Sequence, residues 1–134
     1  AGGMDLNRDW AKLTQPETKA LSAWIVKEVS GRKVVSMMDF HSTDKTVIYA
    51  PPLDSPSPTI DFLKALKTKF DTTLSQPPEW SYAHNPNGGT SKGWALETLK
   101  APGITVELWD QIPTTDARAL GAAAADALIE YAAK

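Results

Sequence analysis

The chain has 134 residues, a net charge of −2 and no cysteine. This length allows one domain with one hydrophobic core, and the weak charge gives no support for binding nucleic acid or an anionic membrane. Without thiolates, any zinc site must use histidine, aspartate or glutamate, and the chain contains only two histidines, His41 and His84.

The first predicted element is a helix that begins near Thr14. Thr14 and Glu17 have the spacing of a capping box, and Pro16 is tolerated in the first turn of a helix. The apolar residues that follow at helical spacing are Leu21, Trp24, Ile25 and Val29.

A buried strand is predicted next, from Lys33 to Phe40, interrupted by Asp39 near its end. His41 and Ser42 follow where the apolar run stops. A histidine at the end of a strand, beside a carboxylate and a hydroxyl, is typical of a metal ligand or a catalytic base. It is equally compatible with an ordinary hydrogen-bonded polar residue.

The second half of the sequence predicts three helices, a strand and a long loop. Ser57-Pro58 can start a helix whose apolar stripe is Ile60, Leu63, Leu66 and Phe70. A long loop, Gln76 to Gly93, precedes a short helix from Trp94 to Leu99 and a strand from Ile104 to Leu108. A helix from about Thr115 to Tyr131 presents one apolar face, made of Leu120, Ala124, Ala127, Leu128 and Tyr131.

Two motif matches suggest a serine nucleophile. Ser91 lies in a G-x-S-x-G pattern, but a turn precedes it and no histidine follows it. Ser42 and Lys45 match S-x-x-K, but β-forming residues follow where that motif requires a helix. Neither context fits the motif. Glu107, between apolar residues of its strand, is either a solvated edge carboxylate or an acid–base group.

Taken together and in order, five segments resemble the second half of a zinc carboxypeptidase of the M14 family. They are Met4 to Trp10, Gln15 to Thr18, Asp39 to Ser42, Gly88 to Ala95 and Thr105 to Leu108. The resemblance implies an α/β fold with a mixed, mostly parallel sheet flanked by helices. It also implies that residues 1–134 form the C-terminal part of a catalytic domain, so that the domain is incomplete.

The resemblance implies specific roles for the residues of these segments. His41 would be a zinc ligand, and Glu107 the general base that activates the hydrolytic water and passes the proton to the leaving amine. Asn7 and Arg8 would bind the terminal carboxylate of the substrate. Ser42, Tyr82, His84 and Ser91 would be further substrate-binding residues, with Tyr82 or His84 in the place of the family's mobile tyrosine.

Other features depart from the family pattern. The chain has no H-x-x-E motif, which supplies the family's first two zinc ligands, and Trp109 stands where animal members have an arginine. We therefore expect weak zinc binding and no activity from this chain alone. Lys92, in the expected substrate pocket, could favour an acidic side chain or could be an exposed lysine.

Several properties are left open by the sequence. The intact protein is expected to remove C-terminal residues from peptides. The alternatives are an amidohydrolase or deacylase of the same fold, acting on an acylated amino acid, and a non-catalytic peptide-binding domain. Asp126 interrupts the longest apolar stretch, so no membrane span is predicted, and no signal peptide pattern is visible. The resemblance to the family favours a secreted or periplasmic location. Exposed apolar surface is expected to promote self-association or contact with a missing N-terminal segment.

Overall fold

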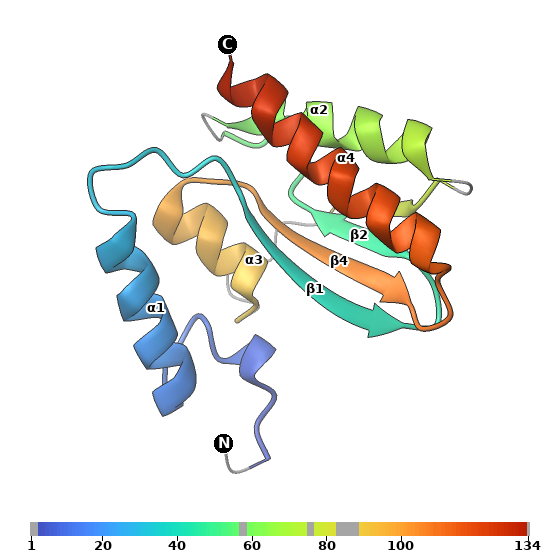
Figure 1. Cartoon of the computed structure of the whole chain (residues 1–134). Helices are drawn as coiled ribbons and strands as arrows, with labels where there is room; N and C mark the ends of the chain where they lie inside the picture. Colours follow the sequence, from blue (N-terminus) through green and yellow to red (C-terminus); the bar gives the residue numbers. More distant parts are fainter. Residues whose placement is uncertain (1–2, 57–58, 75–76, 83–88, 134) are drawn as a thin grey trace.

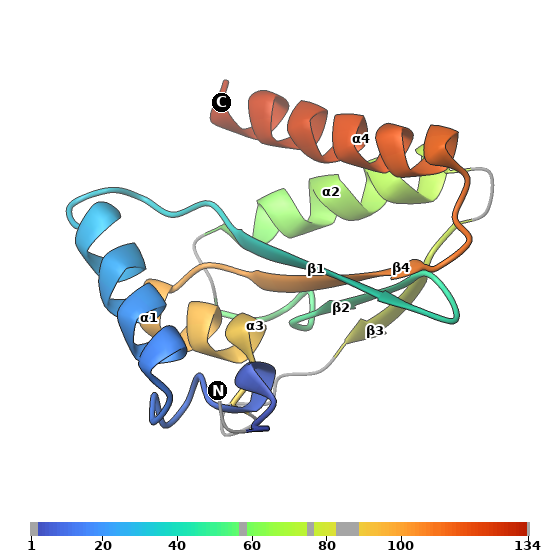
Figure 2. The same ribbon diagram turned by 60° about the horizontal axis from the view of Figure 1, so that its bottom comes forward.

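The structure is a computed structural model that describes residues 3–56, 59–74, 77–82 and 89–133. It has three layers, with a four-stranded sheet between two pairs of helices (Figures 1 and 2). Helices α2 (Ile60–Thr73) and α4 (Thr114–Ala132) cover one face of the sheet. Helix α1 (Pro16–Glu28), the short helix α3 (Ser91–Trp94) and the N-terminal segment lie on the other face.

The sheet is mixed and mostly parallel, as the sequence predicted. Its strands are β1 (Met37–Thr43), β2 (Val47–Ala50), β3 (Glu79–Tyr82) and β4 (Gly103–Trp109), in the spatial order β1-β4-β2-β3. The pairs β1–β4 and β2–β3 are parallel, whereas β2 runs antiparallel to β4. Strand β1 therefore forms one edge of this sheet and β3 forms the other.

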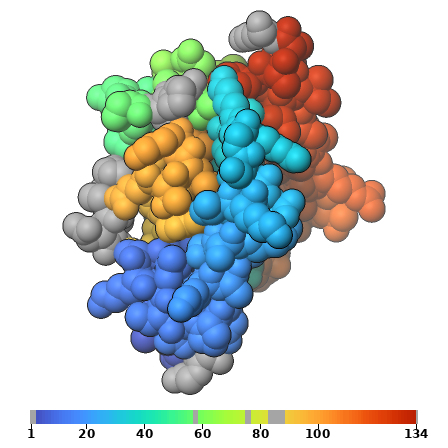
Figure 3. Space-filling view, turned by 90° about the vertical axis from the view of Figure 1, so that its left-hand side faces the viewer, coloured from blue at the N-terminus to red at the C-terminus, as the bar shows by residue number. Residues whose placement is uncertain are grey.

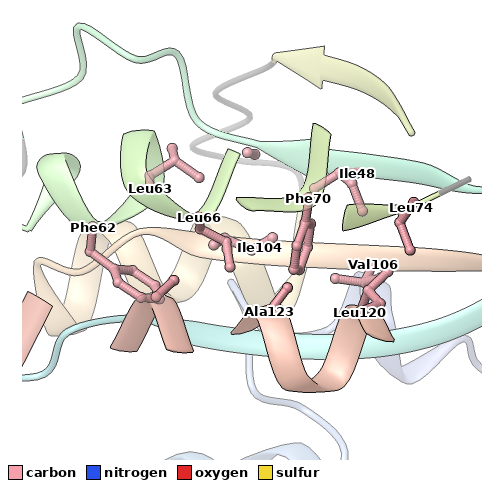
Figure 4. Close-up of a cluster of buried hydrophobic side chains, with 12 residues drawn as sticks. Ile48, Phe62, Leu63, Leu66, Phe70, Leu74, Ile104, Val106, Leu120 and Ala123 are labelled. Atoms are coloured by element: carbon pink, nitrogen blue, oxygen red, sulfur yellow. The ribbon is translucent and has the colours of Figure 1, made fainter. Parts of the chain in front are cut away.

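The main core lies between the sheet and helices α2 and α4 (Figure 4). Leu63, Leu66 and Phe70 of α2 are fully buried, as predicted, and Ile60 is partly buried. Phe62 also belongs to this core. Helix α4 contributes a face that differs from the predicted one, because Leu128 is 44% exposed and Ala123 is buried instead. The fully buried members of the cluster on the sheet are Ile48, Ala50, Ile104 and Val106.

A smaller core lies on the opposite face of the sheet, around two tryptophans. The rings of Trp10 and Trp94 are 5.0 Å apart, and Ala95 completes the buried part of the cluster. Ile25 of α1 packs against this cluster. The predicted apolar stripe of α1 is otherwise wrong as a core face, because Leu21 is 44% exposed and Trp24 is 59% exposed.

Helix α1 begins at Pro16, but Thr14 is not its cap. Gln15 occupies the N-cap position, and its side chain makes no capping hydrogen bond to the helix. Instead, the buried carboxylate of Asp9 fixes the residues just before the helix, accepting hydrogen bonds from the Thr14 and Gln15 backbone N–H groups at 3.0 and 2.8 Å. It also accepts hydrogen bonds from the hydroxyl groups of Thr14 and Thr18. The capping-box prediction was wrong because the Asp9 carboxylate, a few residues earlier in the chain, binds both the backbone and the hydroxyl of Thr14.

Three other boundaries differ from the predictions. Strand β1 starts at Met37 and continues to Thr43, so that His41 lies inside the strand. Strand β3 occupies part of the predicted loop. The predicted short helix consists of α3 and a π-helix, η2 (Ala95–Leu99). Ser57 and Pro58, the predicted start of α2, lie outside the described residues.

Candidate functional site

His41 and Glu107 lie side by side in the sheet. Strands β1 and β4 pair in parallel with a register that puts Asp39 opposite Thr105 and His41 opposite Glu107. Successive side chains of a strand point to opposite faces. Met38 and Val106 pack in the core against α2 and α4, so Asp39, His41 and Glu107 belong to the face that carries α1 and α3. The parallel pairing of the two strands therefore brings His41 beside Glu107.

A hydrogen-bonded cluster surrounds His41 on this face. The Nε2 atom of His41 is 3.2 Å from Oδ2 of Asp39 and 3.5 Å from Nδ2 of Asn7. The hydroxyl of Ser91 donates to the same oxygen of Asp39. The backbone N–H of Ser91 donates to Oδ1 of Asn7 at 2.9 Å. Residues from three distant parts of the chain therefore meet at one point.

The cluster lines an open pocket of about 540 Å³ between the sheet, α1 and the N-terminal segment. The polar residues that line it include Asn7, Asp39, His41 and Ser91, and Met37 and Ile25 form part of its apolar wall. Such a pocket, apolar with a few convergent polar groups, is typical of a small-molecule or substrate site. Figure 3 shows this side of the molecule, where α1 lies against the N-terminal segment and the region of α3.

Backbone contacts bring the N-terminal segment to Ser91. The N–H of Trp10 donates to the carbonyl of Gly89 at 2.8 Å. Gly89 has a φ of +69°, and a Cβ atom there would lie 2.2 Å from the carbonyl oxygen of Arg8. Glycine is thus required both by the backbone conformation and by the close approach of the two segments. This contact places the 3-10 turn η1 (Leu6–Arg8) beside the start of α3.

Lys92 is not the exposed lysine that the sequence allowed. Lys92 is only 9% exposed. Burial lowers the pKa of its ammonium group, whereas the negative charge of Asp39 acts to raise that pKa. The backbone of Lys92 also packs tightly on β4, because a Cβ at Gly103 would lie 2.1 Å from its carbonyl oxygen. Lys92 therefore helps to fix α3 on the sheet.

The structure does not bring every predicted site residue into the cluster. Arg8 lies on η1 beside Asn7, but its side chain is 63% exposed and donates to the carbonyl of Asn7 at 2.8 Å. Ser42 follows His41 in β1 and so belongs to the opposite face of the sheet.

Tyr82 also lies outside the cluster. Tyr82 lies on β3, at the far edge of the sheet, where its ring stacks on Trp80 at 6.1 Å and burial raises its pKa. Trp80 packs with the α2 side of the sheet, so Tyr82 shares that face and not the face of His41. His84 lies outside the described residues.

The serine-nucleophile interpretations are not supported by the geometry. Activation of a serine requires a base that takes its proton, usually a histidine. Here Asp39 lies between Ser91 and His41 and binds both of them. In the S-x-x-K match, Ser42 is in a strand and the ammonium of Lys45 binds Glu79 at 2.6 Å.

The contacts of His41 show whether it could serve as a zinc ligand. A metal-binding histidine usually has a carboxylate or carbonyl at its second nitrogen, and Asp39 supplies such a partner to His41. His41 therefore fits one position of a zinc site. Among the residues that the structure describes, no group of three or more His, Asp and Glu side chains could hold a metal ion. In the same part of the chain, no helix is long and apolar enough to cross a membrane.

Asp39 is the site residue that was missing from the predicted set. The sequence contained a signal for it, because a carboxylate interrupts an otherwise apolar strand two residues before His41. Period-two spacing puts both side chains on one face. What the sequence did not show was that Ser91 and Asn7 would meet the same pair.

Comparison with known proteins bears on the family and the fold of the chain. The sequence profile of the family described as zinc carboxypeptidase, Peptidase_M14, matches residues 3–120. Among solved structures, a metallo-carboxypeptidase from Burkholderia cenocepacia is similar with a TM-score of 0.67 and 15% identity, over 98% of this chain and 40% of that one. A presumed metallopeptidase from Shewanella denitrificans OS217 gives 0.64 and 15%, over 96% of this chain and 52% of that one. No curated protein matches. The chain thus spans about half or less of the length of these two structures.

Proposed function

The chain belongs to the M14 zinc carboxypeptidase family, and from this premise we propose that the protein that contains it is a metallocarboxypeptidase that removes C-terminal residues from peptides. The observation that carries the proposal is the β1–β4 register, which places His41 beside Glu107 on one face of the sheet. A histidine and a carboxylate on neighbouring strands are the two kinds of group that metal-assisted peptide hydrolysis needs from this half of the fold.

Each residue has a distinct part in the proposed reaction. His41 would supply one zinc ligand, and the rest of the protein that contains this chain would supply the others, since a catalytic zinc usually has three protein ligands. Zinc, when bound, acts as a Lewis acid that polarises the scissile carbonyl. The carboxylate of Glu107 accepts a proton from the attacking water and delivers it to the nitrogen of the leaving amine.

Substrate orientation is assigned to the segment that precedes α1. The amide of Asn7 is already fixed by the backbone N–H of Ser91, so it presents a rigid polar group at the pocket. The guanidinium of Arg8 lies on the same turn and is 63% exposed. Arginine binds carboxylates through two parallel hydrogen bonds, which would place the last peptide bond of a substrate at the reacting groups. Binding by Arg8 requires its side chain to exchange the carbonyl of Asn7 for the substrate.

The test uses the natural protein that contains this chain, assayed with matched peptides that end in a free carboxylate or in an amide. We expect cleavage of the last residue only from the free acid, inhibition by a zinc chelator, and recovery when zinc is returned. Glu107→Gln should lower kcat by about 10²–10⁴ because it removes the general base. Asp110→Asn, at an exposed position just after β4, is the matched control and should retain activity.

Arg8→Ala should instead raise KM and reduce the preference for the free acid over the amide. Equal cleavage of both peptides by the unmodified protein would argue against a carboxypeptidase. Release of an acyl group from an acylated amino acid, without peptide cleavage, would identify an amidohydrolase. Activity that survives complete removal of zinc would contradict the proposal.

A further inference from the structure

We propose that Asp39 is a positioning residue that holds His41 in the tautomer with the proton on Nε2, so that the lone pair of Nδ1 is the one available to a ligand. The carboxylate of Asp39 would thereby determine which ring nitrogen of His41 is free to bind a ligand. That the ligand is zinc rests on the proposed function, but the tautomer is a property of the chain itself and can be measured without metal.

The first support is the geometry of the pair. Asp39 and His41 are two residues apart on β1 and share one face of the sheet, with Oδ2 and Nε2 separated by 3.2 Å. An ionised carboxylate can only accept hydrogen bonds, and a neutral imidazole carries one N–H. The contact is therefore a hydrogen bond only if the proton of His41 is on Nε2.

A competing donor makes this inference specific. Nδ2 of Asn7 lies 3.5 Å from the same ring nitrogen. The orientation of this amide is set by the backbone N–H of Ser91, which donates to Oδ1 of Asn7 at 2.9 Å and leaves the NH₂ group toward His41. Asn7 would thus favour an unprotonated Nε2, the opposite of what Asp39 favours. The contact with Asp39 is shorter and involves a charged acceptor, so it should prevail.

The surroundings of Asp39 fix its carboxylate in place. The Ser91 hydroxyl donates to the same Oδ2 that faces His41, and the side chain of Asp39 is only 23% exposed. Its second oxygen, Oδ1, is buried and has no hydrogen-bond partner among the described residues. Removing a hydrogen-bond donor from a largely desolvated carboxylate costs free energy. The carboxylate of Asp39 should therefore keep its hydrogen bonds to both Ser91 and His41.

The tautomer of His41 can be measured by NMR on the 134-residue chain. Long-range correlation of the two ring nitrogens with the ring carbon protons distinguishes the tautomers, at a pH where the imidazole is neutral and in metal-free buffer. A His84→Gln variant assigns the signals of His41. We expect Nε2–H to be the major form in the unmodified chain.

Variants then separate the two neighbours of Nε2. Asp39→Ala should make Nδ1–H the major form, because Asn7 becomes the remaining partner of Nε2. Asn7→Ala should retain Nε2–H, because the competing donor is gone. Asp44→Asn, which changes a carboxylate three residues beyond His41, should leave the ratio unaltered. Asp39→Asn, nearly identical in size, should lower the Nε2–H fraction and serves if Asp39→Ala does not fold.

Two results would overturn the proposal. One is an unmodified chain in which Nδ1–H is the major form, and the other is a tautomer ratio that stays constant when Asp39 is replaced. Neither result depends on peptidase activity. A protein that cleaves peptides but keeps its tautomer in the Asp39 variants would refute the positioning role and leave the proposed function intact. A tautomer change in the Asp39 variants, together with an absence of peptidase activity, would support the positioning role and contradict the proposed function.

Discussion

At the scale of the residue, Gly89 and Asp9 hold the site together from outside it. Gly89 combines a left-handed backbone with a close approach to Arg8. Asp9 gathers donors from Thr14, Gln15 and Thr18 and so ties the start of α1 to the segment that carries Asn7. Neither residue contacts His41 in any described hydrogen bond, yet both fix the backbone from which the pocket is built.

We predict that Gly89→Ala destabilises the chain more than Gly31→Ala. Both glycines have a positive φ, +69° and +74°, and an alanine in this region costs roughly 1–2 kcal/mol. At Gly31 no atom lies within 4 Å of the added methyl, whereas at Gly89 it would overlap the backbone of Arg8. Urea unfolding of the two variants measures the difference. Equal losses would mean that the two segments do not approach each other as described.

The pH dependence of stability should identify Asp9. Burial by itself would raise the pKa of Asp9, but hydrogen bonds from Thr14, Thr18 and the Gln15 N–H outweigh it and hold the pKa well below its usual value. A carboxyl group with a lowered folded-state pKa stabilises the protein above its unfolded pKa of about 4, and this contribution is lost as the pH falls further.

We therefore expect Asp9→Asn to lower the Tm at neutral pH, with a difference from the unmodified chain that shrinks below about pH 4. Thermal unfolding followed by circular dichroism across this range provides the measurement. Asp126→Asn, at an exposed position of α4, is the control and should show no such trend. A pH-independent difference for Asp9→Asn would show that the carboxylate charge is not what stabilises this contact.

At the scale of the element, α2 and α4 stabilise the molecule by covering one face of the sheet together. The two helices pack on each other as well as on the strands, and Phe70 lies at the centre of their core (Figure 4). The ammonium of Lys69 on α2 also binds Glu130 on α4 at 2.5 Å, although such a surface pair contributes little. Stability here should depend on apolar burial and on helix propensity.

Two substitutions in these helices should have opposite effects. Phe70→Ala removes a fully buried ring and should cost about 3–5 kcal/mol. Gly121→Ala, at an exposed position inside α4 with open space around the new methyl, should add about 0.5–1 kcal/mol, since glycine weakens a helix interior. Chemical denaturation measures both. A destabilising Gly121→Ala would imply that this face of α4 is covered in solution.

At the scale of the whole molecule, apolar side chains remain at the surface on α1 and on β1. Trp24 on α1 is 59% exposed and Phe40 on β1 is 55% exposed. Strand β1 is also an edge of the described sheet, where unpaired backbone groups favour association with another chain. Exposed apolar surface of this kind favours intermolecular contacts.

We predict that the isolated chain self-associates in a concentration-dependent manner. Trp24→Glu should reduce the association measured by sedimentation, because it removes the most exposed aromatic ring of α1. Lys27→Glu, on the same helix and also exposed, controls for the change of charge. A chain that stays monomeric at high concentration would contradict the prediction.

The sequence by itself determined the elements whose signal is local or repetitive. The amphipathic stripe of α2 and the apolar runs of β1 and β4 predicted helices and strands, and five segments taken together in order predicted the family. The sequence did not predict the end of strand β1, because this strand extends through polar residues that pairing with β4 stabilises.

Only the tertiary structure decided which of these residues meet. The register of β1 and β4 brings His41 to Glu107, although 65 residues lie between them in the sequence. The meeting of Asp39 with Ser91, and of Asn7 with Ser91, depends on contacts between distant segments. Such contacts have no local pattern, since a donor group can donate a hydrogen bond to any well-placed acceptor, whatever its distance along the chain.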